Sequence, residues 1–369
     1  MAEQRHVLVA GASGLVGYAA MKHFAGLADC KVTAVSRRRP AETFGARFIS
    51  VDLTDAQHCA EIFGAMGDVT HLVYAALFEK PGLVKGWVED DQIATNGQML
   101  RNLFEPLEKA ASGLQHVTFL QGTKAYGVHV RALAVPARED RSEMREQKNF
   151  YWEQEDYIRA KQAGREWAWT ILRPQIICGL AIGAPLNAIA ALGVYGALLK
   201  EEGKPLYYPG GASGVVEAVD TGLLARAIGW AGETQAARNG AFNVTNGDVF
   251  TWNNVWPAIA DAMGMQAGPP MPQSLELTMP ARAGDWDRVR AKYGLVSPGL
   301  IEFVGSSFQF ADMLLGYDVE RGAPRAHTPP FLVSTVKIRR AGFQDVMDTE
   351  EMFRHNFREF QEKLLLPPR

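Results

Sequence analysis

The sequence predicts an α/β fold with a doubly wound parallel sheet, followed by a smaller, mostly helical lobe. Short apolar runs alternate with amphipathic segments through the first half of the 369-residue chain. A glycine-rich turn directly follows the first of these runs, and the regular alternation of apolar runs and amphipathic segments ends after residue 174. Strands spaced by helices in this way are typical of parallel sheets that helices cover on both faces.

Six apolar runs are the predicted strands. In chain order they are HVLVAG (6–11), KVTAVS (31–36), ARFISVD (46–52), THLVYAA (70–76), HVTFLQG (116–122) and WTILRP (169–174). Residues 14–28 and 94–111 carry apolar side chains at spacings of three and four, as helices that cover a sheet do. Residues 349–365 have the same spacing and predict a further amphipathic helix.

The end of the alternating pattern at residue 174 predicts two domains. After residue 174 glycine and proline become frequent, as in KPLYYPGGASG (204–214), and aromatic and methionine residues lie in irregular segments. We expect a dinucleotide-binding domain at 1–175, to which 215–250 return, and a substrate-binding lobe made of 176–214 and 251–369.

Composition and charge argue against several functional classes. A net charge of -3 gives no polycationic surface for nucleic acid or anionic lipid. The three cysteines, Cys30, Cys59 and Cys178, form no C-x-x-C pair, so we expect neither a disulfide framework nor a metal site. The uncharged stretch 174–199 is rich in glycine and alanine, which favours a buried loop and helix over a membrane span. Without a signal-peptide pattern, we expect a cytoplasmic protein.

A dinucleotide site is predicted directly after the first strand, where three glycines form G-x-x-G-x-x-G. Such a turn must be tight, must let the backbone approach a pyrophosphate, and leads into a helix N-terminus whose N–H groups bind anions. The predicted cofactor contacts in this turn are Gly11, Ser13, Gly14, Leu15, Val16 and Gly17.

The end of the second strand favours NADPH over NADH. Where a carboxylate would bind the ribose hydroxyls of NAD, this chain has Ser36, Arg37 and Arg38, which suit a 2′-phosphate. The alternative is that these arginines belong to an ordinary solvated loop. The remaining predicted cofactor contacts lie near the ends of later strands and are Asp52, Leu53, Ala75, Ala76, Gln121, Pro174 and Ile176.

Two tyrosines compete for a catalytic role. Tyr157 and Lys161 spell Y-x-x-x-K, the pair that transfers protons in short-chain dehydrogenases, whereas Tyr151 has no lysine four residues on. Lys124 follows the fifth strand, and a lysine at the carboxyl end of a central strand points into the cofactor cleft. There its ammonium would lower the pKa of Tyr151 and stabilise charge on a substrate oxygen. In the alternative, Lys124 is a rim residue, and Tyr157 and Lys161 are the pair.

Six segments resemble one enzyme family: LQGTKAYGVH (120–129), NFYWEQED (149–156), LRPQIICG (172–179), PLNAIAALGVYGALLKEEGKPL (185–206), AFNVTNGDVFTWNNVWPAIADAMG (241–264) and VKIRRAGFQDVMDT (336–349). They are similar to the progesterone 5β-reductase and iridoid synthase-like (PRISE) enone reductases, an atypical branch of the extended short-chain dehydrogenases with a Rossmann fold. The resemblance covers nearly the whole chain.

The resemblance implies that Lys124 and Tyr151 are the catalytic residues. Tyr151 lies 22 residues before the arginine of L-R-P, Arg173, and Tyr157 only 16. The longer distance is the one that the family implies. One departure is that G-P-F does not follow the K-x-Y element here, which leaves the shape of the substrate pocket open.

The expected function is therefore NADPH-dependent reduction of the C=C bond of an α,β-unsaturated carbonyl, with a steroid, terpenoid or small cyclic enone as the apolar substrate and a homodimer as the plausible assembly. One alternative is a nucleotide-sugar epimerase or dehydratase that uses Tyr157 and Lys161. Another is a non-catalytic regulator that senses NADPH.

Overall fold

The computed structural model describes residues 4–80 and 89–369, and every predicted site residue lies in these ranges. The chain divides into two compact units. The first comprises Met1–Gln175, Gly222–Val244 and Val333–Asp345, and the second Ile176–Thr221, Thr245–Leu332 and Val346–Arg369. Segment 333–345, which we expected in the substrate lobe, thus clusters with the first unit, whereas 215–221 and 245–250, which we expected in the first domain, cluster with the second.

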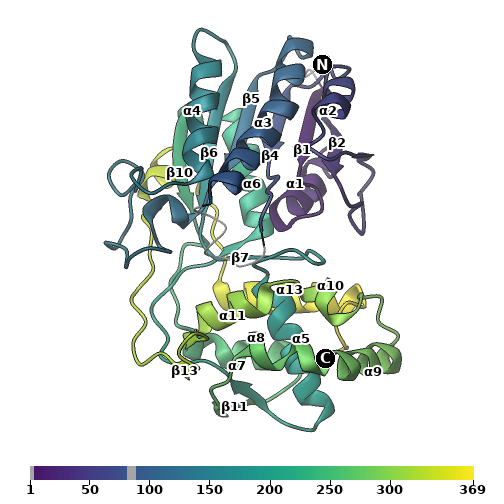
Figure 1. The fold of residues 1–369 in the computed structure, drawn as a ribbon, viewed down its shortest axis with the longest axis vertical. Helices are drawn as coiled ribbons and strands as arrows, with labels where there is room; N and C mark the ends of the chain where they lie inside the picture. Colours follow the sequence, from purple (N-terminus) through teal and green to yellow (C-terminus); the bar gives the residue numbers. More distant parts are fainter. Residues whose placement is uncertain (1–3, 81–88) are drawn as a thin grey trace. The chain divides into compact units, whose positions relative to one another are not determined.

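A seven-stranded parallel sheet forms the centre of the first unit (Figure 1). Its strands are β1 (Arg5–Ala10), β2 (Cys30–Ser36), β3 (Arg47–Ser50), β4 (His71–Tyr74), β5 (His116–Leu120), β6 (Ala168–Pro174) and β10 (Gly240–Val244). Their order in the sheet is β10-β6-β5-β4-β1-β2-β3. This order confirms the predicted doubly wound fold, and β10 adds a seventh strand to the six that the apolar runs predicted.

Three helices, α2 (Ala56–Phe63), α3 (Asp90–Ala110) and α4 (Phe150–Gln162), lie side by side on one face of the sheet (Figure 1). They bury alternate strand residues such as Leu72, Val117 and Ile171, because successive side chains of a strand point to opposite faces.

The opposite face of the sheet carries α1 (Leu15–Ala25) and α6 (Thr221–Glu233). These two helices approach closely, since a Cβ on Gly229 of α6 would lie 3.1 Å from the ring of His23 in α1. The remaining short elements of the first unit are η2 (Thr123–Tyr126), η3 (Gln235–Ala237) and α12 (Val336–Arg340), and α12 packs against β10.

The second unit is mostly helical within the described ranges. Its helices are α5 (Ala188–Glu201), α7 (Trp252–Ala262), α8 (Leu275–Thr278), η4 (Pro280–Arg282), α9 (Ala283–Tyr293), α10 (Leu300–Val304), α11 (Ser307–Leu315) and α13 (Thr349–Glu362). Its short strands are β7 (Ile177–Cys178), β8 (Leu206–Tyr208), β9 (Val219–Asp220), β11 (Ala267–Pro270), β12 (Tyr317–Asp318) and β13 (Ala323–Pro324).

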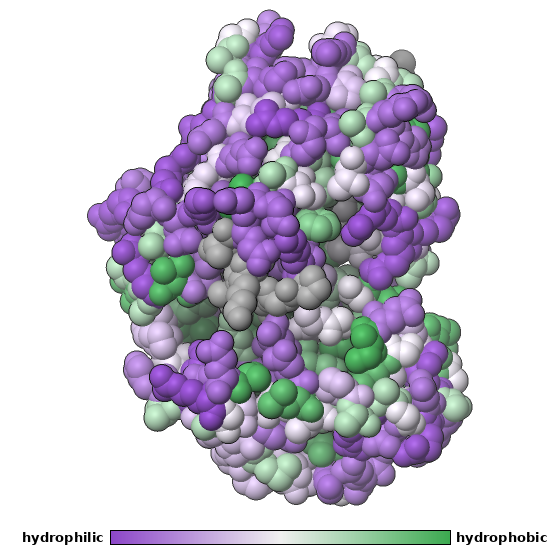
Figure 2. Space-filling model, in the orientation of Figure 1, coloured by the Kyte–Doolittle hydropathy of each residue, from purple (hydrophilic) through white to green (hydrophobic). Residues whose placement is uncertain are grey.

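The helix α5 explains the uncharged stretch of the sequence, because all its residues from Ala188 to Leu199 are buried in the core of the second unit. Across residues 4–80 and 89–369, every helix is too short or too polar to cross a membrane. Hydrophilic side chains dominate the face of the first unit that Figure 2 shows, whereas apolar residues are more frequent on the second unit. Exposed apolar residues of the second unit include Leu277, Val296 and Ile301.

Candidate active site

The three glycines form the tight turn that a pyrophosphate requires. Gly11 has a φ of 84°, and a Cβ there would lie 2.5 Å from the backbone oxygen of Ala75. A Cβ on Gly17 would lie 2.2 Å from the Gly11 oxygen. Gly14 caps α1 without a side-chain hydrogen bond, and the first turn of α1 has no acidic residue. The N–H groups at this helix N-terminus therefore fit an anion such as a dinucleotide pyrophosphate.

The other residues of this turn surround the same helix start. Leu15 is buried, and Ser13 and Val16 are half-buried. Ala75 and Ala76 follow β4, which neighbours β1, and the Ala75 N–H donates to Ala10 at 3.0 Å. The sheet order reverses between β1 and β4, and ligands of open α/β sheets bind outside the strand ends at such a reversal.

The end of β2 presents two exposed arginines, Arg37 and Arg38. The Ser36 hydroxyl donates to the Arg38 backbone oxygen at 2.6 Å, and the Ser50 hydroxyl donates to that of Arg37 at 3.0 Å. These bonds fix the backbone of the loop and leave the guanidinium groups at the surface. The arrangement suits recognition of a phosphate.

Asp52 is engaged in its own turn. Its carboxylate accepts the backbone N–H of Thr54 at 2.9 Å and the Thr54 hydroxyl at 2.8 Å. Those bonds hold the pKa of Asp52 below its ordinary value, with a smaller contribution from Arg37. Leu53 is buried, and its backbone oxygen accepts the Asn102 amide at 2.8 Å. Contacts of these two residues with a cofactor stay a prediction.

Three further predicted cofactor contacts lie in different surroundings. The Gln121 side chain bonds to Glu155 and Arg173, so its backbone is the remaining candidate for a cofactor contact. Pro174 ends β6 in the first unit. Ile176 belongs to the second unit, where its backbone oxygen accepts the Val219 N–H at 3.0 Å.

Tyr151 lies in the first turn of α4, with its hydroxyl against Gly122. Asn149 caps this helix by accepting the Tyr151 backbone N–H at 3.0 Å. A Cβ on Gly122 would lie 3.3 Å from the Tyr151 hydroxyl oxygen, so the glycine permits this close approach. Burial raises the pKa of Tyr151, Glu79 raises it further, and the Gly122 N–H and Arg173 lower it in part. The hydroxyl therefore keeps its proton at neutral pH.

Lys124 lies in η2, two residues after Gly122. An apolar cluster joins η2 to the start of α4 and contains Ala125, Tyr126, Phe150, Tyr151 and Trp152. Burial lowers the pKa of Lys124 to about 7, against a smaller opposing effect of the Glu79 carboxylate. At neutral pH the amine is thus balanced between its charged and neutral forms, as a group that stabilises charge and exchanges protons must be.

Tyr157 and Lys161 face α3 instead. The Tyr157 hydroxyl donates to Glu105 at 3.3 Å, and the Arg101 guanidinium lies 4.5 Å from the Tyr157 ring centroid. Lys161 lies 3.8 Å from Glu108. Both partners are on α3, so the Y-x-x-x-K pair takes part in packing between two helices that cover the sheet.

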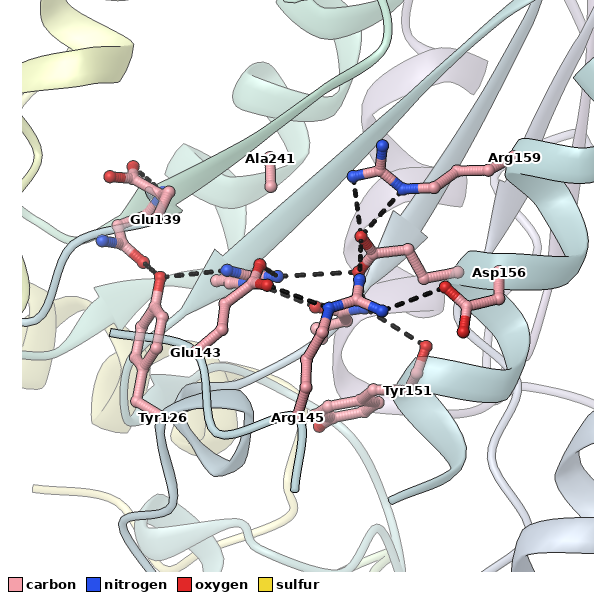
Figure 3. Close-up of polar contacts among 12 residues, drawn as sticks. Tyr126, Glu139, Glu143, Arg145, Tyr151, Asp156, Arg159 and Ala241 are labelled. Atoms are coloured by element: carbon pink, nitrogen blue, oxygen red, sulfur yellow. Dashed lines mark hydrogen bonds and ion pairs between the residues drawn. The ribbon is translucent and has the colours of Figure 1, made fainter. Parts of the chain in front are cut away.

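A network of polar and charged side chains, centred on the buried Arg173 and Glu155, adjoins Tyr151 and was not predicted from the sequence (Figure 3). It joins η2, the segment between η2 and α4, α4 itself and β6. Its main members are Gln121, Tyr126, Glu143, Arg145, Glu155, Arg159 and Arg173. The signal available was the pattern of carboxylates in NFYWEQED together with the arginine of L-R-P, but the pattern does not reveal that Glu155 and Arg173 are buried.

His129 is a further residue that the sequence analysis did not identify. Neither of its ring nitrogens has a hydrogen-bond partner within residues 4–80 and 89–369. Burial and the nearby Lys124 lower the pKa of His129 to about 4, so the ring is neutral at pH 7. Of these two neighbouring groups, Lys124 is therefore the one that carries positive charge near pH 7.

The chain matches a known family model and several known proteins. The family model of the PRISE-like Rossmann-fold domain matches residues 65–315. The (S)-8-oxocitronellyl enol synthase of Nepeta racemosa is 31% identical over 84% of this chain and 82% of its own. The 3-oxo-Delta(4,5)-steroid 5-beta-reductase of Arabidopsis thaliana is 31% identical over 84% of this chain and 83% of its own.

Solved structures share the fold at lower identity. A UDP-N-acetylglucosamine 4-epimerase from Methanobrevibacter ruminantium superposes with a TM-score of 0.65 and 16% identity, covering 98% of this chain and 100% of its own. The enzyme WbmH of Bordetella bronchiseptica, solved in complex with NAD+, gives a TM-score of 0.62 at 14% identity over 97% of this chain and 99% of its own. These likenesses show the fold alone.

Proposed function

Because this chain belongs to the family of the PRISE-like Rossmann-fold domain, we propose that it is an NADPH-dependent reductase of α,β-unsaturated ketones or aldehydes. The observations that carry the proposal are the approach of the Tyr151 hydroxyl to Gly122 and the burial of the Lys124 amine, two residues after that glycine. Two groups that bind a developing oxyanion thereby lie at the carboxyl end of β5, next to the predicted dinucleotide site.

When bound, a nicotinamide cofactor would supply a hydride to the β-carbon of the substrate. The electrons of the C=C bond then move toward the carbonyl oxygen, which becomes an enolate oxygen. Tyr151 and Lys124 bind this oxygen, and their hydrogen bonds strengthen as its charge grows, which lowers the barrier. The α-carbon finally takes a proton from Tyr151 or from water, and the product is a saturated carbonyl.

The preference for NADPH rests on the end of β2. Charge-assisted hydrogen bonds contribute about 1.5–3 kcal/mol each, so Arg37 and Arg38 would favour a 2′-phosphate strongly. We expect Arg38→Asp to weaken NADPH binding by tenfold or more and to change NADH binding little. Fluorescence titration with both cofactors measures this. Equal dissociation constants for NADPH and NADH in the unmodified protein would contradict the preference.

The experiment that tests the reaction follows NADPH absorbance with progesterone, cyclohexenone and a citral-type aldehyde as substrates. The products are then identified by mass spectrometry and NMR. We expect a saturated carbonyl compound from at least one of them. An allylic alcohol as product, or turnover of a nucleotide sugar in place of any enone, would refute the proposed reaction.

Epimerase chemistry is the competing function, because the fold is shared with nucleotide-sugar epimerases. It would require the Y-x-x-x-K pair to face the nicotinamide. The Tyr157 hydroxyl is instead bonded to Glu105, and Lys161 lies near Glu108. The geometry therefore favours enone reduction over epimerisation.

A further inference from the structure

The two proposed catalytic residues come from separate elements, Lys124 from η2 and Tyr151 from α4. To bind one substrate oxygen together, they must be held at a fixed distance. A displacement of about 1 Å between catalytic groups can cost on the order of a hundredfold in rate. The apolar cluster that joins the two elements excludes water, but it gives little directional constraint.

Arg173 of β6 bonds to the chain segment around Lys124. Its side chain is fully buried, and its Nε donates to Gln121 Oε1 at 2.8 Å, just before η2. One Nη donates to the Tyr126 hydroxyl at 3.3 Å, at the end of η2. The other donates to Glu143 at 2.6 Å. A single guanidinium thus fixes residues on both sides of Lys124.

Glu155 holds the helix that carries Tyr151. It lies one turn beyond Tyr151 on α4, and its side chain is also fully buried. Glu155 accepts from Gln121 at 3.0 Å, from Arg145 at 2.8 Å and from Arg159 at 2.7 Å. Figure 3 shows these contacts converging from several elements.

The two halves of the network meet at two places. Gln121 accepts from Arg173 and donates to Glu155, and Arg173 itself lies 3.6 Å from Glu155. The Gln121 amide also lies 3.5 Å from the Tyr151 backbone oxygen. A continuous chain of directional bonds therefore runs from η2 through β6 to the first turns of α4.

We propose that Arg173 and Glu155 are positioning residues that hold Lys124 and Tyr151 at the distance required to bind one substrate oxygen. The inference rests on the proposed function for the roles of those two residues. Buried ion pairs are costly to desolvate, and well-packed apolar side chains of similar volume stabilise a fold equally well or better. What a guanidinium and a carboxylate add is the direction of each bond.

The test uses conservative substitutions with matched controls. Arg173→Lys keeps the charge but loses the fork, and Glu155→Gln keeps the shape but loses the charge. The controls are Arg101→Lys and Glu153→Gln, because Arg101 and Glu153 form an ion pair of 3.4 Å between α3 and α4 whose side chains are 37% and 36% exposed. They remove the same groups without touching η2 or β6.

On an enone that the unmodified protein reduces, we expect Arg173→Lys and Glu155→Gln to lower kcat by about ten- to a hundredfold. The KM for NADPH should stay within about twofold, because Gln121 is the network residue among the predicted cofactor contacts, and its side chain rather than its backbone bonds to Arg173 and Glu155. The control variants should keep kcat. A purely structural role would lower the melting temperature while the surviving folded protein kept a normal kcat, and that result would overturn the proposal.

A second readout does not depend on enone turnover. Trace acetylation with acetic anhydride, followed by peptide mass spectrometry, gives the apparent pKa of the Lys124 amine in each variant. If Arg173 holds η2 in place, Arg173→Lys should loosen it, admit water and raise this apparent pKa by about one unit or more. An unchanged pKa of Lys124 would overturn the positioning role. If the unmodified protein reduced no enone, the proposed function would be wrong. The apparent pKa of Lys124 alone would then test whether Arg173 holds η2 in place.

Discussion

Tyr151 and Tyr157 lie on one helix but have different surroundings at their hydroxyl groups. The Tyr151 hydroxyl lies against Gly122, just past the end of β5, whereas the Tyr157 hydroxyl donates to Glu105. We expect Tyr151→Phe and Lys124→Met each to lower kcat on an enone by on the order of a hundredfold. Tyr157→Phe and Lys161→Met should stay within about threefold, since they change only packing against α3. Steady-state kinetics measures the difference, and an inactive Tyr157→Phe beside a normal Tyr151→Phe would reverse the assignment.

The lowered pKa of Lys124 predicts a pH dependence of catalysis. The charged ammonium stabilises an enolate better than the neutral amine does. Because the pKa of Lys124 is about 7, half of the Lys124 side chains are neutral near that pH. We therefore expect kcat/KM for the enone to fall up to tenfold per pH unit above about pH 7. Lys124→Arg, which keeps its charge at all these pH values, should lack this decline even if its rate is lower. An unmodified protein with a flat profile from about pH 6 to 9 would contradict a role for the ammonium.

At the residue scale the sequence identified both tyrosines but left the choice between them open, and the family resemblance favoured Tyr151. Gly122 explains the geometry, because it is what lets the Tyr151 hydroxyl lie so close to the strand end. The charged network could not be predicted, since Glu155 and Arg145 look like solvated residues of a polar segment. Glu155 is buried because β6, which follows it in the chain, packs against α4, whereas Arg145 stays partly exposed while it bonds to Glu155.

At the scale of the elements, the glycine turn was the most predictable feature. A tight strand-to-helix turn needs positions where no Cβ fits, and the sequence shows them directly as glycines. The position of α12 was not predictable in this way. Its attachment to the first unit depends on a contact between distant residues, in which Lys337 donates to the Ala241 backbone oxygen at 2.8 Å. The local sequence pattern of 336–349 does not indicate which unit α12 joins.

The turn before α1 allows a test of steric constraint with a matched pair of substitutions. A Cβ on Gly17 would lie 2.2 Å from the Gly11 oxygen, whereas one on Gly14 would lie 3.4 Å from the same atom. Gly17→Ala should therefore displace α1 and cost about 1–3 kcal/mol of stability, with weaker NADPH binding as a consequence. Gly14→Ala should keep the melting temperature of the cofactor-free protein within a few degrees. Equal melting temperatures for the two variants would show that the turn can relax.

At the scale of the first unit, opposite edges of the sheet carry different groups. The glycine turn, Lys124 and Tyr151 lie where the parallel strands end. Histidines lie where they begin, with His6 in β1, His71 in β4 and His116 in β5. Register pairs His71 directly with His116. Burial lowers the pKa of all three, that of His116 to about 3.

These histidines predict how stability depends on pH. The folded chain keeps the His116 ring neutral, whereas the unfolded chain binds a proton below about pH 6.5. The unfolded state then holds more protons, so each such histidine removes up to about 1.4 kcal/mol of stability per pH unit as the pH falls from about 6.5 toward the folded value.

His116→Gln removes one of these titrating rings, and His355→Gln, at an exposed position of α13, is the matched control. Between about pH 7 and 5 the unmodified protein should lose about 2 kcal/mol through His116 alone, which corresponds to about 4–8 °C in melting temperature for a domain of this size. Thermal melts at several pH values should show a smaller decline for His116→Gln by that amount, whatever its stability at pH 7, and an unaltered decline for His355→Gln. Parallel curves for all three proteins would mean that His116 accepts its proton in the folded state at an ordinary pH, and that burial at this edge of the sheet does not keep the ring neutral.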